Sequence, residues 1–368
     1  MWPVPFGWTT DGGPSAADRG GSACQRLAHA VPCPRGITGT LLRKPLQYVH
    51  AVDGVSFSMV RGEILGLVGE SGSGKTTTAL TLLGLIEATE GELLFKGQSI
   101  PELAHSRERL RLSREIQIVF QDPYEALNPR QTVFDSVAEP LEIHRLSKSR
   151  AGKIEQVAAA LEAAGLKPPE SFFERYPQGL SGGQRQRLVI AGALVLNPDL
   201  LVADEPVSML DVSIRAEILN LLRQLRDERG ITILYITHDL ATAAYFTDRI
   251  AVMYLGRIVE IGPTGIVLNN PRHPYTKALL SVVPVPNPRQ RRRRLILTGE
   301  TPNPIDLPSG CRFHPRCPIA SEKCSQTEPG LESVGADHQV ACLKWTDVAA
   351  IDEMEVGQAR QQPKEARN

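Results

Sequence analysis

Gly69-Glu70-Ser71-Gly72-Ser73-Gly74-Lys75-Thr76 fits the pattern of a phosphate-binding loop. In such a loop a glycine-rich turn leads into a helix, so that backbone N–H groups and the lysine ammonium surround a di- or triphosphate. The flanking sequence agrees, because residues 63–68 are a short apolar run that predicts a buried strand and residues 75–85 predict a helix. The stretch therefore predicts an α/β fold with a nucleotide site, without saying what the nucleotide is used for.

Two adjacent carboxylates, Asp204 and Glu205, follow the apolar residues 200–203. Because the pleat of a strand points neighbouring side chains in different directions, one carboxylate can hold Mg²⁺ while the other activates water. We expect Asp204 to hold the metal and Glu205 to act as the general base. The alternative is a solvated acidic strand end, which the bracketing Pro198 and Pro206 disfavour.

A second β-branched run, residues 231–237, ends at His238. Between the two runs, apolar residues recur at helical spacing from Asp211 until Gly230. This order predicts a β-α-β unit in a mainly parallel sheet. A lone histidine at a strand end is usually structural, but after a phosphate loop and a carboxylate pair we expect His238 to contact the γ-phosphate.

A further stretch, Leu180-Ser181-Gly182-Gly183-Gln184, adds specificity to these motifs and is called the signature motif below. Its hydroxyl and closely spaced backbone N–H groups can cap a γ-phosphate, and glycine permits a close approach. With Gln121 and the Ser208–Asp211 turn, the motifs occur over roughly residues 45–262 in the order found in ATP-binding cassette (ABC) ATPases, which the chain resembles. In that family two cassettes meet head to tail, and each signature covers the nucleotide held by the other.

The resemblance implies a role for each motif residue. Glu205 would orient and deprotonate the attacking water, assisted by His238 and Gln121. ATP would be bound by residues 69–76 and Thr77, with Tyr48 stacked on the adenine. Mg²⁺ would be held by Thr76, Gln121 and Asp204. Ser181, Gly182, Gly183 and Gln184 would act on the ATP of the partner cassette, and Asp211 would lie at the dimer contact.

Composition along the chain predicts four segments. Residues 1–40 are rich in Gly, Pro, Ala and Ser, which predicts a disordered extension. Residues 41–262 form the expected ATPase domain, which contains an antiparallel sheet within residues 51–100 and a helical subdomain at about 101–185. In the family this subdomain docks a permease. Residues 263–346 form a small cysteine-containing domain, and residues 347–368 a disordered tail.

The segment after the cassette resembles the tail of ATPase subunits of oligopeptide and dipeptide importers, and residues 120–129 are more similar to the F-type than to the D-type subunit. It carries Cys311, Cys317, Cys324 and Cys342. Their spacing allows a metal site, disulfides or buried thiols, and it is looser than that of most zinc sites. Some importers of this family hold a [4Fe-4S] cluster here, so the resemblance implies one, with zinc or no metal as alternatives.

The same resemblance implies the function and partners. We expect an importer ATPase that drives peptide uptake, in a heterodimer with a D-type sister, with two permeases and an extracytoplasmic binding protein. Nickel or glutathione as cargo, and a soluble ABC ATPase without a transport role, are the alternatives. With 41 basic and 41 acidic residues the chain has no basic footprint for nucleic acid. The apolar runs are too short to span a bilayer and the N-terminus does not resemble a signal peptide, so we expect a peripheral protein on the cytoplasmic membrane face.

Overall fold

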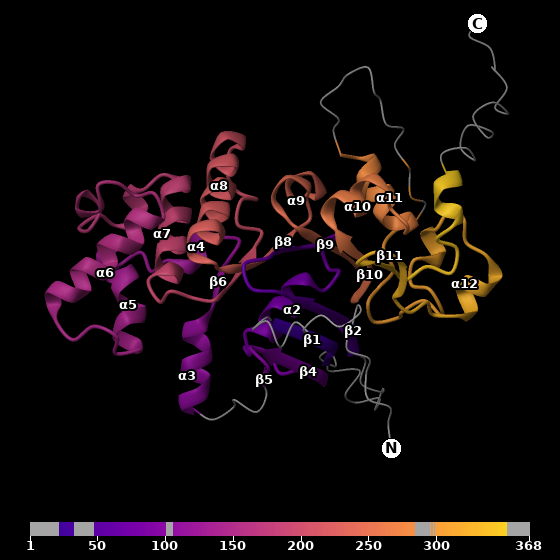
Figure 1. Ribbon diagram of the computed structural model, residues 1–368, viewed down its shortest axis with the longest axis horizontal. Helices are drawn as coiled ribbons and strands as arrows, with labels where there is room; N and C mark the ends of the chain where they lie inside the picture. Colours follow the sequence, from indigo (N-terminus) through magenta and orange to yellow (C-terminus); the bar gives the residue numbers. More distant parts are fainter. Residues whose placement is uncertain are drawn as a thin grey trace, which may run out of the picture. The chain divides into compact units, whose positions relative to one another are not determined.

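The computed structural model describes residues 22–32, 48–100, 106–283, 295, 297 and 299–351. The remainder of the predicted N-terminal extension and residues 352–368 of the predicted tail lie outside these ranges. The chain divides into two compact units. The first comprises Met1–His29, Gly54–Gly66 and Lys75–Thr237, and the second comprises Ala30–Asp53, Leu67–Gly74 and His238–Asn368. Figure 1 shows the elements of both and labels most of the helices and many of the strands.

The first unit contains the predicted parallel sheet. Strands β6 (Ile116–Val119), β7 (Leu200–Asp204) and β8 (Thr232–Thr237) run parallel, with Val202 opposite Ile118 on one side and Leu234 on the other. Every residue of β7 and β8 is buried, as expected for strands covered on both faces. Helix α8 (Val212–Arg229) connects them and ends at Gly230, whose φ of 66° suits glycine. The predicted β-α-β unit is confirmed.

The predicted antiparallel part of the first unit is also present. Strand β4 (Glu90–Phe95) pairs with β5 (Gln98–Ser99) and with β1 (Ser22–Pro32), while β2 (Tyr48–Met59) belongs to both units. β1 differs from the expectation of a disordered segment over residues 1–40. That expectation averaged composition over the whole segment, whereas residues 22–32 contain no glycine and one terminal proline. They can therefore satisfy the backbone groups of the neighbouring strand.

The helices of the first unit cluster around α7 (Gly182–Leu194). α7 packs against α4 (Pro123–Ala126), α5 (Val133–Ile143) and α6 (Arg150–Ala163), as Figure 1 shows. The unit also contains α2 (Lys75–Leu82), α3 (Ser106–Glu115) and the 3₁₀ turns η2 (Pro169–Ser171) and η3 (Pro177–Gly179). The segment predicted as a helical subdomain thus also contributes a sheet strand, β6, because its apolar residues continue the parallel ladder.

The second unit is built on an antiparallel sheet in the order β11-β12-β10-β9. Its strands are β9 (Arg249–Tyr254), β10 (Arg257–Pro263), β11 (Glu332–Gly335) and β12 (His338–Val340). The helices are α9 (Leu240–Phe246), α10 (Thr264–Asn269), α11 (Pro274–Ser281) and α12 (Glu322–Gln326), with 3₁₀ turns η4 (His314–Arg316) and η5 (Asp347–Ala350). The expected boundary at 262/263 falls at the last residue of β10, and it would separate this strand from β12, which pairs with it. η5 lies in the segment expected to be a disordered tail, and Val348 and Ile351 there are buried.

A buried carboxylate explains why the C-terminal segment is attached to β10. Glu260 is fully buried and accepts hydrogen bonds from the backbone N–H groups of Arg272 and His273, at 2.7 and 3.0 Å. Its Oε1 also lies 2.8 Å from Nε2 of His338 on β12. Because a buried carboxylate is stable only when its oxygens are paired, these contacts fix the start of α11 and the place of β12.

Candidate nucleotide site and cysteine pocket

The phosphate-loop glycines are required by their surroundings. A Cβ on Gly69 would lie 2.2 Å from the carbonyl oxygen of Met253, and one on Gly74 would lie 2.1 Å from that of Ala51. Gly74 also has a φ of +103°, which side chains disfavour. Within the loop the N–H of Ser73 donates to the carbonyl of Glu70 at 3.2 Å. The glycines therefore let the loop pack closely against other backbone segments while it keeps its tight turn.

Helix α2 begins at Lys75, as the motif predicts, and the Lys75 side chain is buried. The next residue, Thr76, donates from Oγ1 to Oδ2 of Asp204 at 2.8 Å. Burial, opposed by this hydrogen bond and reinforced by the neighbouring Glu205 charge, raises the pKa of the Asp204 carboxyl above its ordinary value. A hydroxyl and a carboxylate in contact are oxygen ligands of the type that Mg²⁺ prefers.

Glu205 points in a different direction from Asp204. It has a φ of 47°, and its N–H donates to the carbonyl of Ile236 at 2.9 Å. Gln121 donates from Nε2 to Oε2 of Glu205 at 3.2 Å. A non-glycine residue in the left-handed region is a strained conformation that is often found at functional sites. The structure thus brings Thr76 to Asp204 and Gln121 to Glu205.

The signature motif forms the N-terminus of α7. Ser181 is the N-cap, its Oγ accepts from the N–H of Gln184 at 3.3 Å, and the Gln184 side chain accepts from the N–H of Ser181 at 3.0 Å. This capping box leaves the first N–H groups of the helix available for an anion, where the helix dipole favours it. A Cβ on Gly183 would lie 2.7 Å from Cγ2 of Ile214, so packing requires glycine there.

The Ser208–Asp211 turn is held by Arg215, a residue that the sequence analysis did not single out. Arg215 donates from Nε to the carbonyl of Leu210 at 2.7 Å and from Nη2 to that of Ser208 at 3.2 Å. Asp211 is the N-cap of α8, and its backbone carbonyl accepts from the N–H of Arg215. The signal was weak, because an arginine on a helix is common and its targets are backbone oxygens.

The remaining predicted site residues are divided between the units. Ser71, Gly72, Tyr48 and His238 belong to the second unit, and Thr77 to the first. Tyr48 begins β2 with 43% of its surface exposed, and His238 is exposed directly after β8. Each is accessible to a ligand, and their roles stay predictions.

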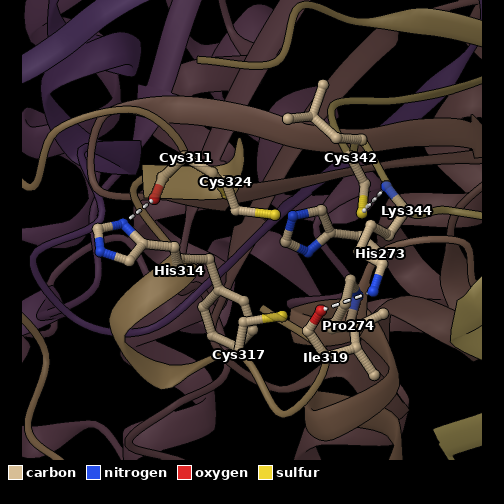
Figure 2. Close-up of a pocket in the computed structure, with 11 residues that line it drawn as sticks. His273, Pro274, Cys311, His314, Cys317, Ile319, Cys324, Cys342 and Lys344 are labelled. Carbon is tan, nitrogen blue, oxygen red and sulfur yellow. Dashed lines mark hydrogen bonds between the residues drawn. The ribbon is translucent and has the colours of Figure 1, made fainter. Parts of the chain in front are cut away.

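The four cysteines of the C-terminal segment line one pocket. Cys311, Cys317, Cys324 and Cys342 are free thiols, and the pocket also contains His273 and Phe313. Figure 2 shows Cys317, Cys324 and Cys342 pointing toward this pocket. The donor set is thus of the kind that binds soft metals and iron–sulfur clusters. Within the described ranges, however, no three His, Cys, Asp or Glu side chains are placed so that they could hold a metal ion.

Burial sets the protonation of this pocket. It raises the pKa of Cys317 to about 11 and that of Cys342 to about 12, and it lowers the pKa of His273 to about 3. The thiols of Cys317 and Cys342 are therefore protonated and the His273 imidazole is neutral at pH 7. Metal binding there would have to release protons from the thiols.

Across the part of the chain that the structure describes, no helix has both the length and the apolar character needed to cross a bilayer.

Comparison with known proteins identifies the family. The family model described as "ABC transporter" matches residues 52–208, and that described as "Oligopeptide/dipeptide transporter, C-terminal region" matches residues 259–324. The putative oligopeptide transport ATP-binding protein YkfD of Bacillus subtilis is 47% identical over 80% of this chain and 89% of its own. The dipeptide transport ATP-binding protein DppF of Haemophilus influenzae is 48% identical over 82% and 91%.

A solved structure agrees with these relatives. A dimeric ATP-binding cassette in a post-hydrolysis state, bound to ADP and Pi, superimposes with a TM-score of 0.56 and 29% identity, over 66% of this chain and 98% of that one. The predicted fold class is confirmed. The chain belongs to the ABC transporter ATP-binding proteins that carry the oligopeptide/dipeptide transporter C-terminal region, which are ATPases that use ATP with Mg²⁺.

Proposed function

We propose that this chain is the ATP-hydrolysing subunit of a peptide importer. The observation that carries the proposal is the different placement of two adjacent carboxylates at the end of β7, where Asp204 accepts a hydrogen bond from Thr76 of α2 and Glu205 accepts one from Gln121. Thr76 and Asp204 would hold Mg²⁺, which neutralises phosphate charge when bound. Glu205 would accept the proton of the attacking water, and Gln121 would orient Glu205.

Other residues of the site complete this assignment. Lys75 and the loop of residues 69–76, with Thr77, would bind the phosphates, Tyr48 the adenine, and His238 the γ-phosphate. The N-terminus of α7, with Ser181, Gly182, Gly183 and Gln184, would cap the ATP held by a second cassette, and Asp211 would lie at that contact. The capping box supports this role, because it leaves helix N–H groups free for an anion from outside.

Glu205→Gln tests the catalytic assignment. We expect ATP affinity to stay near that of the wild type and turnover to fall at least about 100-fold, because a general base contributes about 10²- to 10⁴-fold. The variant should form a stable ATP-bound dimer, measured by size-exclusion chromatography with ATP. Glu174→Gln, an exposed glutamate of the same unit, is the matched control. Near-normal turnover by the Glu205 variant would refute the assignment.

The proposed cargo is supported by the relatives and not by the geometry of the site. The names of the relatives specify oligopeptide or dipeptide transport, which supports peptide as the cargo here. We propose a heterodimer with a D-type sister, docked to two permeases on the cytoplasmic membrane face and supplied by an extracytoplasmic binding protein. Residues 120–129 and the helices around α7 would contact the permeases.

Uptake by proteoliposomes tests the cargo. The chain would be reconstituted with the permeases, sister ATPase and binding protein encoded by neighbouring genes, and ATP-dependent accumulation of dipeptides, longer peptides, Ni²⁺ and glutathione would be compared. We expect accumulation of peptides only. Accumulation of Ni²⁺ or glutathione without peptide would replace the cargo and leave the ATPase assignment standing.

We also propose that the four pocket cysteines ligate a [4Fe-4S] cluster. Four thiols drawn from separate segments to one pocket support this, since clusters of this kind are held by four cysteine thiolates. The protonated thiols of Cys317 and Cys342 would have to ionise on binding. The cluster has no part in the hydrolysis described above.

A further inference from the structure

The phosphate loop contains an acidic residue, Glu70, between its first two glycines. A free carboxylate in a loop that surrounds an anion is unfavourable, because two negative charges repel each other strongly where water is scarce. Glu70 is nevertheless only 31% exposed in its side chain. Its contacts within the second unit explain how this charge is accommodated.

Two residues of the C-terminal segment bind the Glu70 carboxylate. Arg316 donates from Nη1 to Oε2 of Glu70 at 3.2 Å, and Thr301 donates from Oγ1 to the same oxygen at 2.9 Å. Arg316 Nη1 also lies 3.1 Å from Oγ1 of Thr301. Because the Arg316 side chain is only 11% exposed, the pair is shielded from water and salt better than an ordinary surface ion pair.

A third residue binds the backbone of Glu70. The N–H of Glu70 donates to the hydroxyl of Tyr275 on α11 at 3.0 Å. Tyr275 is fully buried, with its ring centre 4.7 Å from that of Tyr254 and 5.4 Å from that of Phe313. The hydroxyl of Tyr275 is therefore fixed by packing. It holds the backbone of Glu70, while Arg316 holds the side chain of Glu70.

Arg316 itself is placed by a rigid turn next to the cysteine pocket. Its N–H donates to the carbonyl of Phe313 at 3.0 Å, and the N–H of Cys311 donates to the carbonyl of Cys324 at 2.8 Å. Gly310 has a φ of +65°, and a Cβ there would lie 2.5 Å from that same carbonyl. The turn therefore has little freedom to shift.

We propose that Tyr275, Thr301 and Arg316 are positioning residues of the nucleotide site, which hold Glu70 and keep its charge from opposing the phosphates. The C-terminal segment thereby sets the ATP affinity of its own subunit. The inference rests on the proposed nucleotide site. It adds three residues that lie between 205 and 246 positions from Glu70 in the sequence.

Charge substitutions test this arrangement with a predicted sign. Arg316→Gln leaves the Glu70 charge uncompensated, so we expect the Kd for ATP to rise about three- to tenfold, as for loss of one charge-assisted contact. At saturating ATP, kcat should stay within about twofold, because Arg316 does not touch the reacting atoms. Glu70→Gln in the Arg316→Gln background removes the uncompensated charge and should restore Kd to near the wild-type value.

Fluorescence titration of the full chain with an ATP analogue gives these values. Rescue by Glu70→Gln separates a charge effect from a packing defect, because removing a charge would not repair packing. Lys323→Gln, which removes one positive charge from an exposed site on α12, is the matched control.

The outcomes separate the two levels of inference. If the wild-type chain binds ATP and Arg316→Gln binds it with the same Kd, the positioning role is overturned and the proposed function stands. Additive defects in the double variant also overturn it. A wild-type chain that binds no ATP overturns the proposed function and, with it, this inference.

Discussion

At the scale of single residues, Gly183 is subject to two constraints. The proposed role in capping a partner's ATP needs a small residue for close approach. The structure adds a packing constraint, because a Cβ on Gly183 would lie 2.7 Å from Cγ2 of Ile214. The two constraints can be separated, since only the second depends on Ile214.

Gly183→Ala should lower the melting temperature by several degrees, since overpacking costs about 1–3 kcal/mol and each kcal/mol shifts Tm by about 2–4 °C in domains of about 150–250 residues. ATPase activity should also fall. Adding Ile214→Ala relieves the overlap, so the double variant should regain its melting temperature but not its activity. Thermal melts and phosphate-release assays measure both. Recovery of full activity in the double variant would show that packing alone requires glycine at this position.

At the scale of elements, local patterns predicted the parts of the fold that have a local cause. The glycine turn before α2 and the two carboxylates at the end of β7 each arise from residues adjacent in sequence, and each is present in the structure. Strand alternation predicted that Asp204 and Glu205 would point in different directions. The hydrogen bond from Gln121 to Glu205 was not predicted, because the sequence analysis placed Gln121 at the metal.

Elements with a nonlocal cause were missed. β1 forms because the edge of β4 offers unpaired backbone groups, which no composition count over residues 1–40 can reveal. β6 was hidden within a helical segment, because a four-residue strand carries little periodicity. The Arg316–Glu70 contact spans 246 positions, so neither residue bears a signal of the other.

At the scale of the whole molecule, the family's two sequence regions do not correspond to the two compact units. The phosphate-loop residues Leu67–Gly74 are grouped with the C-terminal segment, and the sheet of that unit combines β9 and β10 with β11 and β12. Glu70 carries contacts from the first region to Arg316 in the second. A change in the cysteine pocket can therefore reach the phosphate loop without leaving this unit.

Metal removal tests that relation and the proposed cluster together. Anaerobically purified protein should be brown, contain iron and absorb at the blue edge of the visible spectrum, because thiolate-to-iron charge transfer colours such clusters. Cys317→Ser should lose the iron, whereas Cys24→Ser, on β1 of the other unit, should keep it. Because Arg316 directly precedes the proposed ligand Cys317, loss of iron should also weaken ATP binding. That loss should be smaller in the Arg316→Gln background, where the contact to Glu70 is already absent. Colourless, iron-free protein would contradict the cluster. Zinc in its place would show that the pocket holds a single ion. An equal loss of ATP affinity in the wild-type and Arg316→Gln backgrounds would show that the pocket does not act on the phosphate loop through Arg316.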